Sequence, residues 1–406
     1  MLNKPTKRQV YLILFTGFML MFLSSSVKNV FQVWFIDICN SFGITRSEFS
    51  FSGTTFMLVT GIGSWIAGVL SDRIGASRTI LVGCFFIAMS FIGSALVANF
   101  YFFVALYGGV AALALAAVQY VPMGVLVDQS FSGKNKGIAY ALLVNGTGLG
   151  FVILSPIWVY LNLSYSWQEV YIALGCVFLL LILPMVYFTL PRDDAPKQET
   201  NEQRFSSRRE MWLHTLSQPA FWFIALSFFG CGVNMAFIDI HFVPMMQDAN
   251  TAPSVTGLAL SVLGALEMIG GFIAGWLTGR VKPALLLSGF YALRAVSGWL
   301  LMNATDEFTL IVFSAIFGMT YLGTVIVTSL FCLNFFGAEN KASVFGLVFF
   351  IHQIGAALST WAGARIFDAY GNYTYAVAIA VGFSILSALL ALGLFTQKSE
   401  PVPEST

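Results

Sequence analysis

Charged side chains are scarce in this sequence. Asp, Glu, Lys and Arg make up only 10% of the 406 residues, whereas soluble domains carry about 25%. Apolar residues make up 58% of the chain, which is more hydrophobic surface than a single core in water can bury. These proportions exclude an ordinary soluble domain and favour a chain that lies in a lipid bilayer.

Cysteines and net charge are also low. The five cysteines lie far apart and include no CxxC pair, so we expect neither a disulfide framework nor a zinc site, and we interpret them as packing residues. The net charge of +1 gives no reason to expect a nucleic-acid partner. We assign no metal site and no cofactor from the sequence.

Motifs for nucleotide binding and hydrolysis are missing. The chain has no GxxxxGK[ST] loop, which excludes a self-contained ATP-driven pump, and no HExxH or GxSxG motif, which argues against an enzyme. The run from Gly146 to Gly150 resembles GxGxxG, but no strand precedes it, so we interpret it as close helix packing. Any transport must therefore draw its energy from a gradient.

Long apolar runs dominate what remains. They extend over about twenty residues or more, the length that a helix needs to cross ~30 Å of hydrocarbon. They are apolar on every face, which favours helices over a β-barrel. The first run has no clear cleavage site before or within it, so we expect a spanning helix rather than a signal peptide. We predict an all-α membrane protein with twelve transmembrane helices, at 10–36, 50–70, 78–98, 101–127, 137–161, 168–190, 219–243, 255–279, 283–302, 308–332, 343–364 and 372–396.

One long polar segment divides the chain. Residues 191–218 contain Pro, acids and bases without a long apolar run, which predicts a cytoplasmic linker between a first half, 1–190, and a second half, 219–406. An internal repeat supports this division, because Gly68–Arg73 recurs as Gly275–Arg280 after the second helix of each half. We therefore predict two pseudo-symmetric six-helix halves.

Basic residues set the orientation of these helices. If the helices alternate in direction, most Lys and Arg residues fall on one side, which is the cytoplasmic side by the positive-inside rule. We predict a monomeric multi-pass protein of the cell (inner) membrane with both termini in the cytoplasm. The residues on that side are Lys4, Lys7, Arg8, Arg73, Arg78, Lys134, Lys136, Arg192, Lys197, Arg204, Arg208, Arg209, Arg280, Lys282, Lys341 and Lys398.

The loop after the second helix carries a recognisable motif. Gly68-Val-Leu-Ser-Asp72-Arg73-Ile-Gly75-Ala-Ser-Arg78 resembles the signature loop of the major facilitator superfamily. The resemblance implies that Asp72, Arg73 and Arg78 latch the cytoplasmic side in one conformation. The alternative is a solvated turn that carries only the positive-inside charge. In the second half Gly279 stands in place of Asp72, so we expect a weaker latch there.

Other segments are similar to the monocarboxylate transporter and oxalate/formate antiporter branch of that superfamily. They are 42–50, Ser261–Met268 and Phe345–Gly355, together with Lys28 late in helix one. The resemblance implies that Lys28 binds the substrate and that Glu267 in helix eight binds the proton. The arginine expected four residues after that acid is missing, because Gly271 stands there, so the direct carboxylate clamp of the family is absent.

Charges inside the spans need partners, because each costs about 2.5–3.5 kcal/mol at a helix centre. Glu267 and Arg294 both lie ~20 Å from the cytoplasmic ends of their helices. They are either a fixed structural ion pair or a pair that opens when Glu267 takes a proton. Lys28 lies ~27 Å from the inner end of its helix, where it either attracts an anion or reaches the outer surface harmlessly.

Uncharged polar residues inside the spans leave the same choice open. Gln119, Asn145 and Asn234 serve either as hydrogen bonds between helices or as substrate ligands. His352 is either a neutral core group or a ligand for substrate or proton. Asp239 and His241 near the outer end of helix seven form either an entrance site or part of an exposed loop.

Together these features predict a secondary active transporter. We expect it to move a small organic anion, a carboxylate, by proton-linked alternating access, with a small-molecule substrate, protons and the lipid bilayer as its partners. The residues expected to bind the substrate are Lys28, Gln119, Asn145, Asn234, Arg294 and His352. The alternative is an exporter of hydrophobic drugs or metabolites, which the 40 Phe, 14 Tyr and 9 Trp residues favour.

The orientation can be tested by single-cysteine labelling. A cysteine at Lys134 or Lys341 should react with a membrane-impermeant thiol reagent only from the cytoplasmic side, and one at Thr305 only from outside, because these loops alternate between the two faces. The unsubstituted chain, with its own five cysteines, is the background control. Labelling from the opposite faces would contradict the predicted orientation.

Overall fold

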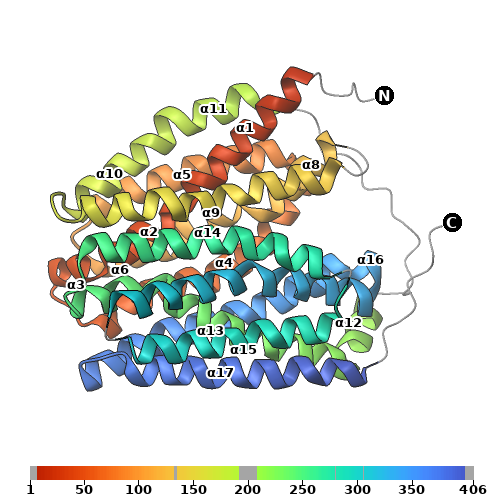
Figure 1. Ribbon diagram of the computed structural model, residues 1–406. Helices are drawn as coiled ribbons and strands as arrows, with labels where there is room; N and C mark the ends of the chain where they lie inside the picture. The colour runs from red at the N-terminus through yellow and green to blue at the C-terminus, as the bar shows by residue number, and fades with distance from the viewer. Residues whose placement is uncertain (1–6, 132–134, 192–207, 279, 305, 398–406) are drawn as a thin grey trace. The chain divides into compact units, whose positions relative to one another are not determined.

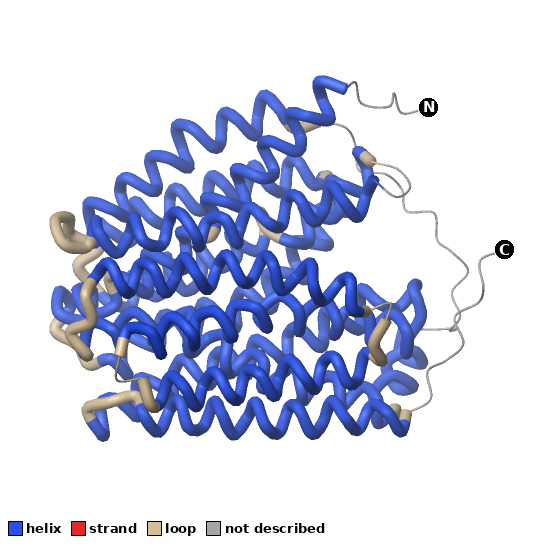
Figure 2. The backbone as a smooth tube through the Cα atoms, in the orientation of Figure 1, coloured by secondary structure: helices blue, strands red, loops and turns tan. Residues whose placement is uncertain are grey.

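A computed structural model describes residues 7–131, 135–191, 208–278, 280–304 and 306–397. The regular structure of this part of the chain is entirely helical (Figure 2). In chain order (Figure 1) the helices are α1 Lys7–Ser24, α2 Ser26–Val33, α3 Phe35–Phe42, α4 Arg46–Ile74, α5 Ala76–Leu96, α6 Phe100–Phe103, the π-helix η1 Val104–Ala111, α7 Ala112–Ala116, α8 Tyr120–Ser130, α9 Asn135–Leu161, α10 Trp167–Val177, the π-helix η2 Phe178–Ile182, α11 Leu183–Thr189, α12 Arg208–Ser217, α13 Pro219–Asp248, α14 Pro253–Leu277, α15 Pro283–Met302, α16 Glu307–Tyr370, α17 Thr374–Gly393 and the 3-10 helix η3 Leu394–Thr396.

These helices supply twelve candidate membrane spans in the described residues. Some spans combine consecutive short helices, and α16 provides two. The prediction of an all-α membrane protein with twelve transmembrane helices is confirmed. The spans are Gln9–Val33, Arg46–Ser71, Ala76–Leu96, Phe100–Val127, Ala139–Leu161, Trp167–Thr189, Pro219–Asp248, Pro253–Leu277, Pro283–Met302, Glu307–Phe336, Ser343–Tyr370 and Thr374–Thr396.

The chain divides into two compact units. Unit 1 comprises Met1–Lys197 and Asp239–Gly264, and unit 2 comprises Gln198–Ile238 and Ala265–Thr406. Within unit 1, α1 packs along α9 and α5 packs along α10; within unit 2, α15 packs against α16 and α17 (Figure 1). The predicted boundaries at 190 and 219 stay a prediction.

Glycines in α9 set its distance from α1. A Cβ atom on Gly146 would collide with the Phe18 carbonyl oxygen, and one on Gly150 would collide with the Phe22 carbonyl and the Ser25 hydroxyl. Small residues of this kind let two membrane helices approach until their backbones touch. The interpretation of this glycine run as close helix packing is confirmed.

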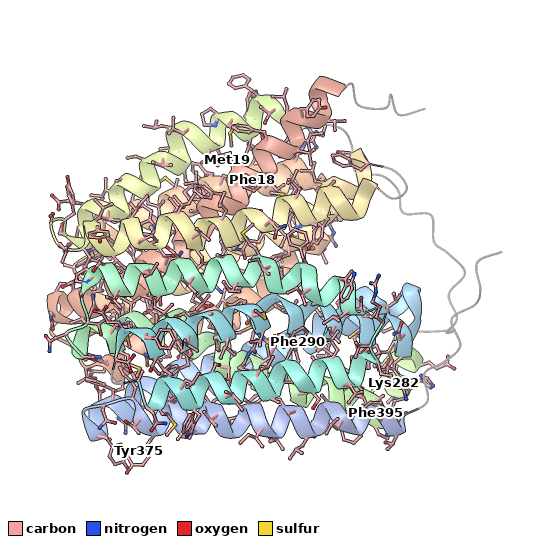
Figure 3. All side chains as sticks on the ribbon, in the orientation of Figure 1. Phe18, Met19, Lys282, Phe290, Tyr375 and Phe395 are labelled. Carbon is pink, nitrogen blue, oxygen red and sulfur yellow. The ribbon has the colours of Figure 1, made fainter. Side chains whose placement is uncertain are left out.

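In unit 2 the chain end packs against the start of α15. Lys282, which precedes α15, places its Nζ 5.5 Å from the centre of the Phe395 ring in η3, and Figure 3 shows the two side chains at the same end of this unit. Further along α15, the Phe290 ring lies against Gly323 of α16, where a Cβ atom would come within 2.9 Å of it. These contacts tie α15 to the helices on both sides of it.

The turn between α4 and α5 depends on one glycine. Gly75 has φ 92° and ψ 150°, a region that residues with a Cβ atom essentially never occupy. Its N–H donates to the Ser71 carbonyl at 3.0 Å and its own carbonyl accepts from the Thr79 backbone at 3.1 Å. Arg73 and Arg78, one on each side of the turn, are both exposed.

Some sequence predictions concern residues outside the described part of the chain. Lys134, Gly279 and Thr305 belong there, as does most of the predicted linker, 192–207. Asp72 lies in α4, but its side chain is also outside the description. The predictions for these positions stand as sequence predictions.

The Gly75 turn yields a stability prediction. Gly75→Ala should lower the free energy of unfolding by about 1–3 kcal/mol, because alanine is strained at this positive φ. The matched control is Gly275→Ala, since Gly275 is helical and a Cβ atom there meets nothing within 4 Å. Thermal unfolding of the purified proteins in detergent measures both. An unchanged midpoint for Gly75→Ala would contradict the prediction.

Candidate functional site

An ion pair joins two spanning segments of unit 1. The Lys28 ammonium in α2 lies 3.2 Å from Asp239 Oδ2 in α13. The Lys28 side chain is 28% exposed and that of Asp239 only 6%. Lys28 therefore has a partner inside the protein. Asp239 is a buried residue of α13 and not part of an exposed loop.

Short helices and hydrogen bonds fix the position of Lys28. It lies in the eight-residue helix α2, between chain irregularities at Ser25 and Trp34. On one side Asn29 Nδ2 donates to Ser155 Oγ of α9 at 2.9 Å. On the other, the hydroxyl of Tyr107 in η1 donates to the Val27 carbonyl at 3.1 Å. These bonds hold both neighbours of Lys28, so its ammonium has a defined place.

Aromatic rings surround this segment. Phe31, one turn after Lys28, stacks on Phe49 at 5.0 Å and on Tyr107 at 4.6 Å between ring centres. Phe35 packs edge-on against Phe49 at 4.8 Å and against His241 at 5.8 Å. Rings of this kind exclude water and lower the local dielectric, which strengthens an ion pair and raises the cost of leaving either charge alone.

The chemistry of the pair follows from this setting. A buried ammonium needs one anion beside it, and Asp239 supplies that anion here. A ligand carboxylate can take the same place if Asp239 becomes neutral by binding a proton. The pair therefore combines a cation with a carboxylate that lies within hydrogen-bond distance of it.

Arg294 of α15 is completely buried in unit 2. Its Nε donates to Thr320 Oγ1 at 3.2 Å, and its Nη2 donates to the Thr320 carbonyl at 2.9 Å and to Thr324 Oγ1 at 3.4 Å. Its Nη1 donates to Cys231 Sγ at 3.0 Å. The hydrogen bonds of this guanidinium thus go to α13 and α16, and Glu267 of α14, itself buried, is not among their acceptors.

His352 of α16 is buried close to the same group. Its Nδ1 lies 3.2 Å from Gln353 Oε1 and its Nε2 lies 3.4 Å from Met235 Sδ. Met235 in turn lies 3.4 Å from Cys231 Sγ. The structure therefore brings two predicted ligands, Arg294 and His352, to one cluster through Cys231 and Met235.

The three amides have different surroundings. Asn234 is buried in α13 and is hydrogen-bonded to α17, because Nδ2 donates to the Ala380 carbonyl at 3.1 Å and Oδ1 accepts from Ser384 Oγ at 3.0 Å. Asn145 is half-buried in α9. Gln119 is half-buried at a break between α7 and α8. The hydrogen bonds of Asn234 therefore join α13 to α17.

The break at Gln119 has a chemical cause. Pro122 lies in the first turn of α8, and it has no N–H to donate to the carbonyl four residues earlier, at Val118. The backbone leaves the helical conformation over 117–119 as a result. Irregular backbone at membrane depth is tolerated where protein or a water-filled cavity surrounds it.

Arg280, the second-half counterpart of Arg73, has a defined role at a helix end. Its Nη1 donates to the Trp276 carbonyl at 2.8 Å, and its guanidinium lies 4.1 Å from the centre of the Trp276 ring. A basic side chain that bonds to the last carbonyls stabilises the end of α14.

The sequence interpretation missed Asp239 as a partner of Lys28 and Cys231 as a partner of Arg294. Depth was the available signal for the first. At ~1.5 Å per residue, Asp239 lies ~30 Å from the start of α13 and Lys28 ~27 Å into its span. An intramembrane cation and acid at one depth are expected to pair. No residue pattern indicated that a thiol would accept from Arg294.

Known proteins resemble this chain along most of its length. The family model described as "Major Facilitator Superfamily" matches residues 14–360 and 240–406. The chain belongs to this superfamily. It is 29% identical to the "Uncharacterized MFS-type transporter YcxA" of Bacillus subtilis (strain 168), with 98% of each chain covered. The chain is therefore a membrane transporter and not an enzyme.

More distant relatives are monocarboxylate transporters. The chain is 25% identical to "Monocarboxylate transporter 12" of Xenopus laevis over 83% of this chain and 77% of the relative. It is 23% identical to "Monocarboxylate transporter 4" of Mus musculus over 94% of this chain and 82% of the relative. The predicted resemblance to this superfamily and to this group within it is confirmed.

A solved structure has the same fold. The bacterial homolog to the human lysosomal transporter Spinster, in an inward-facing and unoccupied conformation, superposes with a TM-score of 0.76. The superposition covers 96% of this chain and 97% of that chain at 14% identity. This similarity supports the twelve-helix architecture.

The Lys28–Asp239 pair yields a second stability prediction. Lys28→Gln should lower the free energy of unfolding by about 1.5–3 kcal/mol, because it removes a charged hydrogen-bond partner from a buried carboxylate. Adding Asp239→Asn should restore much of that loss, since neither charge then remains. Thermal unfolding of the single and double variants measures the coupling. Losses that simply add would show that the two side chains do not stabilise one another.

Proposed function

We propose that this transporter is a proton-linked carrier of a small organic anion, a carboxylate, and that it works by alternating access in the bacterial inner membrane as a monomer. The observation that carries the proposal is the ion pair between Lys28 and Asp239, 3.2 Å apart inside the spanning segments of unit 1. The monocarboxylate transporters among the relatives support the same substrate class.

The pair links proton binding to substrate binding. When Asp239 binds a proton, it becomes neutral and releases Lys28, and the carboxylate of the substrate takes its place beside the ammonium. When the substrate leaves, Asp239 gives up the proton and pairs with Lys28 again. The half-buried ammonium then has one anion beside it at every stage, so no step leaves it without a counter-charge.

The need of Lys28 for a counter-charge also explains why proton movement and substrate movement are coupled. A carrier with both proton and substrate has a neutral Asp239 and a paired Lys28, and an empty carrier has Lys28 paired with Asp239. A carrier with the proton alone has an unpaired ammonium in a low-dielectric setting, which is unfavourable. Only the fully loaded and the empty carriers are therefore expected to change conformation.

Other residues keep the roles predicted from the sequence. We propose Glu267, which is 6% exposed, as a second proton-binding group, and Gln119, Asn145, Asn234, Arg294 and His352 as substrate ligands. Asp72, Arg73 and Arg78 are proposed to latch the cytoplasmic side. The aromatic rings around Lys28 pack on one another, so they provide the low dielectric of an ion-binding site and give the drug-exporter alternative no separate support.

Uptake by proteoliposomes tests the proposal. The purified protein should accumulate a radiolabelled acid from a panel of small carboxylates when the outside is acidified, and less without a pH gradient. Asp239→Asn, a neutral mimic of the protonated side chain, should abolish pH-driven accumulation and keep substrate exchange. Lys28→Gln should lower both at least tenfold, because the anion loses its counter-charge.

The matched control is Asp248→Asn, which breaks a second ion pair, Arg46–Asp248 at 2.6 Å, at the end of the same helix α13. It should keep pH-driven uptake. Glu267→Gln is measured in parallel: loss of coupling there with full coupling in Asp239→Asn would place the proton on Glu267. A Lys28→Gln protein that accumulates every acid normally would overturn the proposed anion site.

A further inference from the structure

Two soft sulfur atoms and an imidazole nitrogen lie close together in the interior of unit 2. Cys231 and Met235 lie one turn apart on α13, with 3.4 Å between Sγ and Sδ. His352 comes from α16 and places Nε2 3.4 Å from the same Sδ. All three residues are at most 7% exposed, so a thiol, a thioether and an imidazole converge away from bulk water.

The imidazole is oriented with its Nε2 lone pair toward the Met235 sulfur atom. Nδ1 lies 3.2 Å from Gln353 Oε1, and an amide oxygen can only accept, so Nδ1 carries the hydrogen. In the neutral ring Nε2 then has a lone pair. Phe349 stacks on this ring at 5.5 Å and Phe228 packs on it at 4.5 Å, so the ring cannot turn away easily.

This arrangement has the form of a metal site with its supporting contact. Metal-binding histidines usually donate their other N–H to an oxygen, which fixes the tautomer and the ring orientation, and Gln353 supplies that oxygen here. Bonds of about 2.0 Å to nitrogen and 2.3 Å to sulfur place neighbouring ligands about 3.5–4 Å apart. The observed separations of 3.4 Å need only a small expansion.

We propose that Cys231, Met235 and His352 form a binding site for a soft monovalent metal ion, copper(I). Thiolate and thioether ligands select copper(I) over magnesium, calcium and manganese, which take oxygen ligands. Because the two sulfur ligands and one nitrogen are provided by only two helices, the site is complete within unit 2.

Copper(I) binding leaves the net charge of the site unchanged. The Cys231 thiol loses its proton to water as the copper–sulfur bond forms, so one monovalent cation replaces another and no electron is transferred. Arg294 Nη1 donates to Cys231 Sγ at 3.0 Å. A metal-bound thiolate can keep such a hydrogen bond, and the bond adjusts the affinity of the thiolate for the metal. The other guanidinium bonds, to Thr320 and Thr324, stay in place.

The sequence alone did not reveal this site. No group of three or more His, Cys, Asp and Glu side chains among the described residues could hold a metal ion. The proposed site differs because one of its three ligands is a methionine. The spacing of Cys231 and Met235 is visible in the sequence, but the third ligand lies more than a hundred residues later. Only the packing of α13 against α16 brings it near.

Anaerobic titration of the purified full-length protein with copper(I) tests the proposal. The protein should withdraw one equivalent from the coloured copper(I)–bicinchoninate complex. Met235→Leu, which keeps the volume and apolar character of the side chain, should weaken binding at least tenfold, and Cys231→Ser and His352→Gln should weaken it further. Cys84→Ser removes a buried thiol of unit 1 and should leave binding unchanged.

Copper X-ray absorption identifies the ligands. Two sulfur neighbours at about 2.3 Å and one nitrogen at about 2.0 Å are expected, with one sulfur lost in Met235→Leu. Size-exclusion profiles establish that each variant is folded. A wild-type protein that leaves all copper with the chelator, a spectrum without sulfur, or equal losses in Cys84→Ser and Met235→Leu would each overturn the proposal. Transport of carboxylates is measured separately, so a failure there leaves this test intact.

Discussion

Hydrocarbon offers no hydrogen bonds, and most features of this chain follow from that constraint. Each buried polar group must find its partner inside the protein. The backbone meets this requirement with helices, and it departs from them at 117–119, where Pro122 removes a donor. Side chains meet it in pairs and clusters: Lys28 with Asp239, Arg294 with two threonines and a thiol. The few charges that the sequence retains are therefore the places where function is expected.

The two cations inside the spanning segments are stabilised in different ways. Lys28 faces a carboxylate that can change its charge by binding a proton. Arg294 is held by three hydrogen bonds to Thr320 and Thr324 and by one to Cys231. In the proposed function Asp239 exchanges a proton, whereas the threonine hydroxyls stay neutral. The first arrangement suits a group that exchanges partners, and the second suits a group that stays in place.

Much of the fold could be predicted from the sequence, because apolar runs of about twenty residues have one solution in a bilayer. The packing role of Gly146 and Gly150 was also accessible, since small residues without a preceding strand indicate helix contacts. Side-chain partners were harder. Depth along a helix can be counted, and it pairs Lys28 with Asp239 as readily as Glu267 with Arg294. The rotation of a helix about its own axis cannot be counted in this way. That rotation determines that Arg294 points to Cys231 and that Asn234 points to Ser384.

The break before α8 has a consequence for how this transporter can be studied and altered. Pro122 has no N–H, so the Val118 carbonyl cannot receive the helical hydrogen bond that residue 122 would otherwise donate. Replacing side chains one at a time leaves a main-chain oxygen untouched. Alanine scanning therefore does not test the Val118 carbonyl. Replacing Pro122 with a residue that has a backbone N–H does test it, because the missing hydrogen bond can then form.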